Sequence, residues 1–218
     1  MPRRRDFLSK IAATGLAAAI PFDAFAETPL PLHDGRWDLA WAAKLRGTSR
    51  AVFDSPNLEE GVAFYRACMW RDQLNEVYGT PKEDVTPVVV IRHQAIPLIM
   101  GDEHWDELEV GKSAKVKDSK TGKWIRRNPI MSSMSDGPAA FADYTLPKFI
   151  ATGGIVLACG LAFQRSVVSK YVKDKKLTKD DAEKLARERV VPGVILQPSG
   201  FFAVLKAQDE GCRYFLGS

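Results

Sequence analysis

The chain has 218 residues, of which 45% are hydrophobic and 27% charged, with a formal net charge of +4. This length is enough for one domain with a real core and short for two. The small excess of basic residues argues against nucleic acid as a partner, because nucleic-acid-binding domains carry strong basic patches.

The first 26 residues have the layout of an export signal. Arg3 to Arg5 precede a mildly apolar stretch, and AFA (24–26) forms a small-x-small cleavage site. RRDFL (4–8) fits the twin-arginine pattern, and an apolar core rich in Ala and Gly suits export of a folded protein. An ordinary signal for unfolded export is the alternative. Both interpretations predict a periplasmic protein.

Cleavage after Ala26 leaves 192 of the 218 residues. They contain no second apolar run near the roughly 18 residues of a membrane span, so we expect no membrane association after cleavage. Residues 27–47 are interpreted as an N-terminal extension, and residues 48–218 as one domain.

Strand and helix patterns alternate from residue 50 onwards. RAVF (50–53) is a short β-type run, and apolar residues then recur at helical spacing from Leu58 to Tyr78, which predicts a helix of about five turns. PVVVIRH (87–93) is apolar and β-branched for most of its length, as expected of a strand that is buried on both faces.

The stretch from about 101 to 140 interrupts this alternation. It is polar, and a hairpin through Ser119 to Gly122 is predicted. One interpretation is a basic lid that attracts anions such as thiosulfate or sulfite, and the other is a solvated insertion. Its basic residues are Lys112, Lys115, Lys117, Lys120, Lys123, Arg126 and Arg127.

The alternation resumes with GIVLA (154–158) and GVILQ (193–197), which have the character of buried strands. Helices are predicted over 160–173, after Thr178 as a cap, and over 201–211, followed by a last strand in CRYFL (212–216). Apolar strands joined by helical crossovers indicate a mostly parallel sheet covered on both sides, a three-layer α/β domain.

Cys159 stands where the third strand meets a helix. Free N–H groups and the positive end of the helix dipole favour a negative charge on the sulfur there. Gly160 has no Cβ and lets the backbone approach whatever the sulfur carries. A thiolate at an exposed strand end is a nucleophile that can accept a sulfur atom as a persulfide. The alternative is a small buried apolar side chain, a common role of free cysteine.

Two segments carry a resemblance to a known family. ATGGIVLACGLAFQRS (151–166) and VPGVILQPSGFFAVLKAQDEGCRYF (191–215) resemble the DsrE/DsrF-like sulfur-relay family, most closely its exported branch. The resemblance implies a flavodoxin-like sandwich with a five-stranded sheet, a homo-oligomer (trimer or hexamer), and a sulfur acceptor at Cys159. The stretch 101–140 is longer than in the small cytoplasmic members, and many relatives have no established activity.

The other two cysteines are predicted to be structural. Cys68 falls within the long helix as core filler, and Cys212 stands at the entry to the last strand. A disulfide from Cys212 to Cys68 or to Cys159 remains open, and the second would make the protein a thiol-disulfide oxidoreductase. With three cysteines, at least one thiol is unpaired within the chain.

Several polar residues are further candidates. In a parallel sheet His93 would emerge at the same edge as Cys159, where it could hold the thiolate or move a proton, or be a plain strand-end residue. Ser199 and Gly200 open the last helix and either bind an anion through backbone amides or simply cap the helix. GDEHW (101–105) matches no established metal-ligand spacing, so no metal is predicted.

The sequence therefore predicts an exported protein that binds or transfers sulfane sulfur on Cys159. No cofactor is predicted. Its partners would be small sulfur species or a sulfur donor or acceptor protein, and whether it is a sulfurtransferase-like enzyme stays open. The alternatives are a non-catalytic oligomeric binding or scaffold module and the thiol-disulfide oxidoreductase described above. A third is a cofactor-carrying protein, because twin-arginine export is used for proteins that receive a cofactor before translocation.

Overall fold

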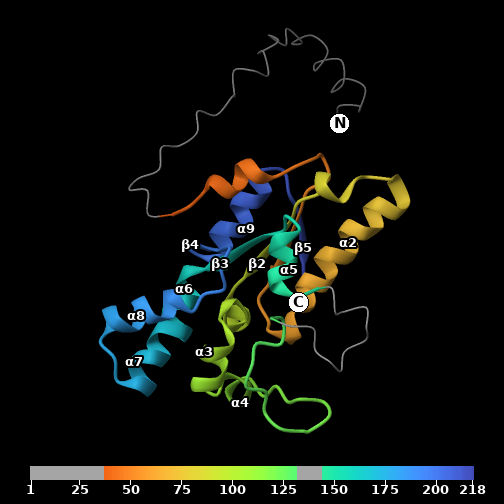
Figure 1. Cartoon of the computed structure of the whole chain (residues 1–218). Coiled ribbons are helices and arrows are strands. Elements are labelled where there is room, and N and C mark those ends of the chain that lie inside the picture. The colour runs from red at the N-terminus through yellow and green to blue at the C-terminus, as the bar shows by residue number, and fades with distance from the viewer. Residues whose placement is uncertain (1–36, 132–143) are drawn as a thin grey trace, which may run out of the picture. The chain divides into compact units, whose positions relative to one another are not determined.

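Five parallel strands form the middle layer of the structure, a computed structural model that describes residues 37–131 and 144–218. The described strands are β1 (Ala51–Ser55), β2 (Pro87–Ile91), β3 (Ile155–Cys159), β4 (Val194–Gln197) and β5 (Arg213–Leu216). Their order across the sheet is β4-β3-β2-β1-β5, and every pairing is parallel (Figure 1). The predicted three-layer α/β fold with a five-stranded, flavodoxin-like sheet is confirmed.

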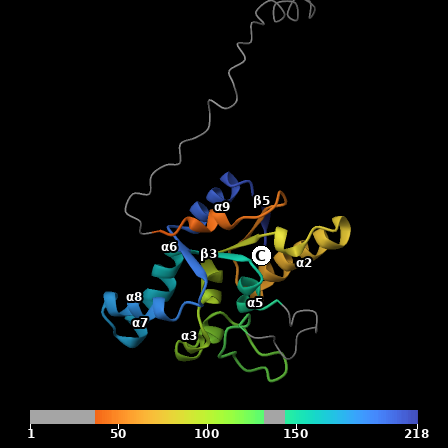
Figure 2. The same ribbon diagram turned by 45° about the horizontal axis from the view of Figure 1, so that its top comes forward.

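Helices cover both faces of this sheet. Phe53, Val89 and Val156 point into a core that α2 (Val62–Tyr78) and α5 (Leu146–Ala151) cover. The alternate side chains, such as Val90, belong to a second core with α9 (Gly200–Asp209). Figure 2 shows α9 on one side of the sheet and α5 with α3 (Asp102–Glu107) on the other. Burial on both faces explains why the strand sequences are apolar without alternation.

Local signals in the sequence place the helix ends. Gly79 adopts a left-handed conformation after α2, where its N–H caps the last turn. The Thr178 hydroxyl accepts the Asp181 N–H at 3.2 Å at the start of α8 (Lys179–Glu188), which confirms the predicted cap. Within the described ranges no helix has both the length and the apolar character that a membrane span requires.

The crossover from β3 to β4 differs from the continuous helix predicted over 160–173. A short α6 (Gly160–Ala162) leads into a π-helical segment, η7 (Phe163–Val168), and then into α7 (Ser169–Lys175). The Ser169 hydroxyl donates to the Gln164 carbonyl, five residues back, at 3.0 Å. Such a π segment rotates the side chains after it relative to an ordinary helix and often marks a functional region.

Residues 37–47 pack against the sheet, although the sequence suggested an extension up to residue 47. The 3-10 helix η2 (Ala40–Lys44) buries Trp41 completely in the core shared with α9. The Trp41 indole N–H lies 3.4 Å from the Gln197 side-chain oxygen. The predicted export signal at 1–26 lies outside the described residues.

The predicted insertion is partly a packed element. After the 3-10 helix η5 (His93–Ile99), helix α3 buries His104 and Trp105, and α4 (Val110–Ser113) follows. The predicted hairpin is present as an antiparallel bridge between Lys117 and Trp124. Residues 132–143 of this stretch lie outside the described residues. Two further 3-10 turns, η3 (Glu59–Gly61) and η4 (Lys82–Asp84), flank α2.

A buried histidine joins α3 to the β3–β4 crossover. The Nδ1 atom of His104 lies 2.9 Å from the Tyr171 hydroxyl, which also accepts a hydrogen bond from Arg189 at 3.0 Å. Arg189 in turn binds both carboxylate oxygens of Glu107. Burial, together with the nearby Arg189 and Lys170 charges, lowers the pKa of His104 to about 4.

We expect the free energy of unfolding to fall as the pH drops from about 6.5 towards 4. The unfolded chain takes up the His104 proton near its ordinary pKa, while the folded chain resists until about pH 4. The loss attributable to this group is on the order of 3 kcal/mol, and it should be measured by urea unfolding across that pH range. The variant His104→Gln should lose this component; an unchanged pH dependence in the variant would contradict the assignment.

Candidate functional site

A cleft of about 440 Å³ opens at the carboxyl edge of the sheet. Because the strands are parallel, the segments that follow β2, β3 and β4 meet at this edge. The cleft is lined by Arg92, His93 and Gln94 after β2, by Cys159, Leu161, Ala162, Arg165 and Ser166 at the end of β3 and in the following helix, and by Gly200 and Phe201 at the start of α9.

Cys159 is the last residue of β3 and the N-cap of the helix that follows. Its sulfur accepts the Ala162 backbone N–H at 3.4 Å. The predicted position of the sulfur over the first turn of a helix is therefore confirmed. The predicted exposure is wrong, because the residue is only 7% exposed and packs against the core. The cleft, which Cys159 helps to line, is therefore the place where a reactant would meet the thiol.

Arg92 brings a fixed positive charge to the cleft. Its guanidinium binds both oxygens of Asp54 at 2.7 and 2.8 Å, and the Tyr214 hydroxyl donates to the same carboxylate at 3.0 Å. The hydrogen bond to Asp54 raises the pKa of Arg92, so this side chain stays charged. Sequence reasoning missed Arg92 and Asp54. Both are polar residues at the ends of apolar strands, and that signal could have identified them.

His93 lies in the lining of the same cleft as Cys159, as predicted from its position after β2. It is exposed and has a left-handed backbone conformation, with φ of 52°. No hydrogen bond joins its ring to Cys159 in the described part of the chain. In this conformation His93 is available to a molecule in the cleft but does not hold the thiol.

The three other predicted site residues have different roles. Gly200 lines the cleft, and a Cβ there would lie 2.6 Å from carbons of Arg92. Gly160 does not line it; a Cβ at Gly160 would lie 2.7 Å from the Gln197 carbonyl oxygen, so this glycine lets the β3–α6 turn pack against the end of β4. The Ser199 hydroxyl accepts the Phe202 N–H at 3.1 Å and so caps α9, one of the two roles considered from the sequence.

Cys68 and Cys212 are buried away from the cleft. Cys68 belongs to the core under α2 and Cys212 to the core under α9, on opposite faces of the sheet. Burial raises the pKa of each thiol to about 11. All three cysteines are free, so neither disulfide considered from the sequence is formed.

The residues of GDEHW serve the fold. Asp102 accepts the Asn128 backbone N–H at 2.9 Å, and His104 binds Tyr171. Over the described ranges, no three His, Cys, Asp or Glu side chains group as metal ligands would. Residues 101–131 contribute nothing to the lining of the cleft, so the described part of the basic stretch does not support the lid interpretation.

Compared with known proteins, the chain matches no family model and no curated sequence. The resemblance to the DsrE/DsrF-like family therefore stays a prediction made from the residues of the two segments around Cys159 and Cys212.

We expect iodoacetamide to modify Cys159 at least about tenfold faster than Cys68 or Cys212 in the folded protein at pH 8. Only a thiolate reacts, and the other two thiols are buried with a pKa of about 11. Peptide mass spectrometry after short labelling times measures the three rates. Unfolding in urea is the control and should make the rates similar. Equal, slow labelling of all three in the folded state would mean that the cleft does not give access to Cys159.

Proposed function

We propose that this protein binds or transfers sulfane sulfur as a persulfide on Cys159, after export to the periplasm. The observation that carries the proposal is the environment of this thiol: of the three cysteines, Cys159 lines the cleft and has a backbone N–H directed at its sulfur. Cys68 and Cys212 are buried elsewhere.

The charges around the cleft favour anions. Arg92 and Arg165 both line it, and no carboxylate among the described residues does. Arg92 is compensated by Asp54, while Arg165 forms no ion pair with another described residue. A cleft with a positive field raises the local concentration of anions and stabilises a thiolate or a bound persulfide anion. The N–H of Ala162 adds a hydrogen-bond donor at the sulfur itself.

The reaction needs no external oxidant. The Cys159 thiolate attacks the outer sulfur of a donor such as thiosulfate, and a new S–S bond forms. The bond between the donor's two sulfurs breaks, and sulfite leaves with the electron pair. The product is the Cys159 persulfide anion, so charge and electrons balance. His93 is placed in the cleft where it could donate or accept a proton at the leaving group.

The low exposure of Cys159 favours a second candidate function. A residue that is 7% exposed and caps a helix could serve packing alone, in a non-catalytic binding module with this fold. The two candidates differ in one measurable property, because only the first requires Cys159 to take up sulfur.

We expect incubation with thiosulfate or inorganic polysulfide to add the mass of one or more sulfur atoms to the wild-type protein, and dithiothreitol to remove it. The variant Cys159→Ser keeps a good helix cap and should gain no mass. Intact mass spectrometry makes the comparison. The matched controls, Cys68→Ala and Cys212→Ala, should label like the wild type. Equal labelling of the wild type and Cys159→Ser, or none, would overturn the proposal in favour of the packing role.

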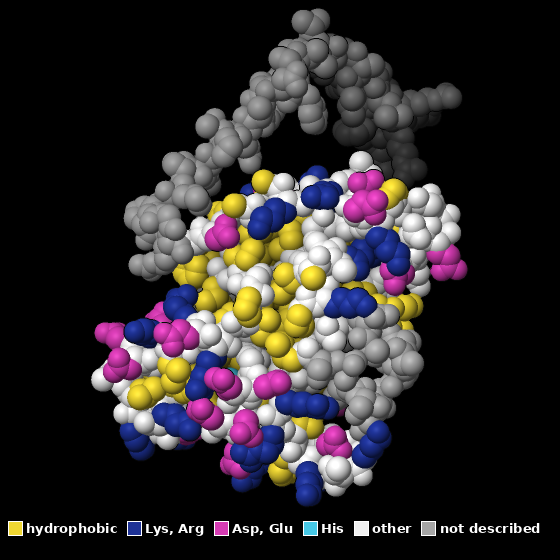
Figure 3. All heavy atoms as spheres, viewed as in Figure 1, with side chains coloured by type: hydrophobic (Ala, Val, Ile, Leu, Met, Phe, Trp, Pro, Cys, Tyr) yellow, Lys and Arg dark blue, Asp and Glu magenta, His cyan; other side chains and the backbone are white. Residues whose placement is uncertain are grey.

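Self-association is part of the same proposal. β5 is an edge strand on which Phe215 and Leu216 are exposed. On α9, Phe201 and Leu205 have exposed fractions of 66% and 59%. Figure 3 also shows hydrophobic side chains gathered in the middle of one face, with charged residues around them. Such apolar surface is common where subunits meet, and the family resemblance implies a trimer or hexamer.

We expect light scattering of the purified protein to give a mass above that of one chain. The variant Leu216→Asp should lower that mass, because it introduces a charge on the edge strand. Lys184→Asp, at an exposed position of α8, is the control. A monomeric wild type at micromolar concentration would contradict self-association.

A further inference from the structure

The lining of the Cys159 cleft is rich in groups that donate hydrogen bonds. Its polar side chains are those of Arg92, His93, Gln94, Arg165 and Ser166. Each of them can donate a hydrogen bond, and no carboxylate stands among the described lining residues. Within the described ranges, the side chains of Gln94, Arg165 and Ser166 make no hydrogen bond to another residue. The cleft therefore offers several unused donors to a ligand that carries acceptor atoms.

The two arginines differ in how their charge is compensated. Asp54 accepts from Nε and Nη2 of Arg92, and the remaining N–H groups of that guanidinium stay available to a ligand. Arg165 is exposed and forms no ion pair with another described residue. Glu183 of α8 pairs with Arg187 instead, at 2.7 and 2.9 Å. Arg165 therefore contributes the uncompensated positive charge of the lining.

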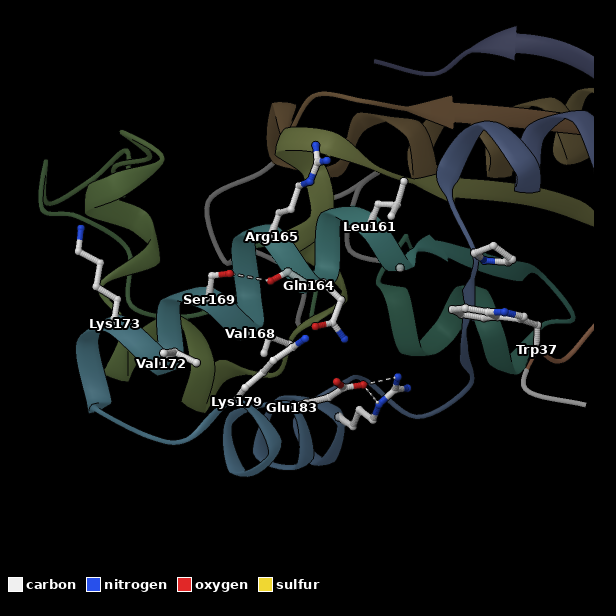
Figure 4. Close-up of a pocket in the computed structure, with 13 residues that line it drawn as sticks. Trp37, Leu161, Gln164, Arg165, Val168, Ser169, Val172, Lys173, Lys179 and Glu183 are labelled. Carbon is white, nitrogen blue, oxygen red and sulfur yellow. Dashed lines mark hydrogen bonds and ion pairs between the residues drawn. The ribbon is translucent and has the colours of Figure 1, made fainter. Parts of the chain in front are cut away.

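Arg165 reaches the cleft from the helical run that begins after Cys159. Leu161 and Arg165 are four residues apart, so they lie on one side of this run, and both line the cleft. In Figure 4 both side chains extend from the side of the run that is turned away from α8. Arg92 lines the cleft from the segment after β2, and its aliphatic carbons pack so closely on Gly200 that a Cβ there would lie 2.6 Å from them. Two guanidinium groups from different elements thus line one cavity of about 440 Å³ together with the thiol.

These features favour a sulfur donor with an oxygen-rich, anionic head. A thiolate that attacks an anionic donor is repelled by it, and a cation beside the reacting atoms reduces that repulsion. A sulfonate or sulfonyl group has several oxygens that accept hydrogen bonds from different directions at once, and such bonds from a guanidinium are strong. An alkyl persulfide would place hydrocarbon and weakly accepting sulfur beside the same donors and leave them without partners. The lining therefore distinguishes between these two classes of donor.

We propose that the cleft binds its donor as a sulfur oxyanion, thiosulfate or an organic thiosulfonate, and that Arg165 recognises the oxidised sulfur of that donor. This inference rests on the proposed persulfide function of Cys159. The Cys159 thiolate attacks the outer sulfur, a new S–S bond forms, and the donor's S–S bond breaks. Sulfite, or the sulfinate of a thiosulfonate, leaves with the electron pair, and its charge develops beside Arg165. Arg165 thus determines which donor is used, while Arg92 supplies further hydrogen bonds.

The binding test uses the Cys159→Ser variant, which can hold the donor but has no thiol to take up sulfur, with thiosulfate as the probe. We expect saturable shifts in an amide NMR titration, centred on residues 92–94 and 160–166, and competition by sulfate. Adding Arg165→Gln should weaken the affinity about fivefold, as expected for the loss of a solvated ion pair, and Arg165→Lys should restore most of it. The control Lys173→Gln removes the same charge from α7, outside the lining of the cleft, and should bind like its parent.

A second test measures the charge at the thiol without forming a persulfide. Two methanethiosulfonate reagents of similar size, the anionic 2-sulfonatoethyl and the cationic 2-(trimethylammonio)ethyl compound, convert a thiolate into a mixed disulfide and release methanesulfinate. We expect the ratio of the anionic to the cationic rate at Cys159 to fall about threefold or more in Arg165→Gln, and to stay unchanged in Lys173→Gln. Peptide mass spectrometry after short reaction times measures both rates.

The outcomes separate the two proposals. No saturable binding of thiosulfate, or equal effects of Arg165→Gln and Lys173→Gln in either test, would overturn the role of Arg165. If thiosulfate still adds sulfur to Cys159 in that case, the persulfide function stands. If binding depends on Arg165 but wild-type Cys159 takes up no sulfur, only the persulfide function is rejected.

Discussion

The hydrogen bond from the Ala162 N–H to the Cys159 sulfur fixes the geometry on which the rest of the site depends. The position of Cys159 is fixed both by the strand before it and by the helix after it. β3 is buried between β2 and β4 and cannot shift without breaking two ladders of hydrogen bonds. The helix must begin directly after it, because Gly160 packs closely against the end of β4 and leaves no room for a Cβ. Strand pairing and turn packing, rather than a flexible loop, therefore set where the thiol lies.

One of the two positive charges that line the cleft, that of Arg92, is held by the other strands of the same edge. Arg92 follows β2, Asp54 belongs to β1, and Tyr214 belongs to β5. Moving Arg92 away would leave the Asp54 carboxylate buried without a partner, and breaking a buried ion pair in this way costs several kcal/mol. Asp54 therefore holds Arg92 firmly in place. Arg92 keeps about a third of its side chain exposed, which limits its desolvation cost. The result is a cation with a defined position that still acts on the cleft.

Most of the fold could be predicted because it depends on local pattern. The apolar, β-branched run PVVVI predicts a buried strand from its own residues alone. Thr178 caps a helix through the N–H of Asp181, only three residues away. The burial of Trp41 could not be predicted, since it depends on a contact with Gln197, 156 residues away. The same holds for the low exposure of Cys159: the strand end was predicted, but the residue packs into a core whose other members come from distant parts of the chain.

The choice of cysteine at position 159 is informative about the two candidate functions. If the side chain served only as a helix cap, serine would do better, because its hydroxyl is a stronger acceptor than sulfur. If it served only as apolar filler, its surroundings would be hydrocarbon on every side. In the structure the sulfur accepts an N–H, while the residue shares a cleft with Arg92, His93 and Ser166. Neither simple role requires that combination, whereas a sulfur that alternates between thiolate and persulfide anion needs both a donor at the atom and positive charge around it.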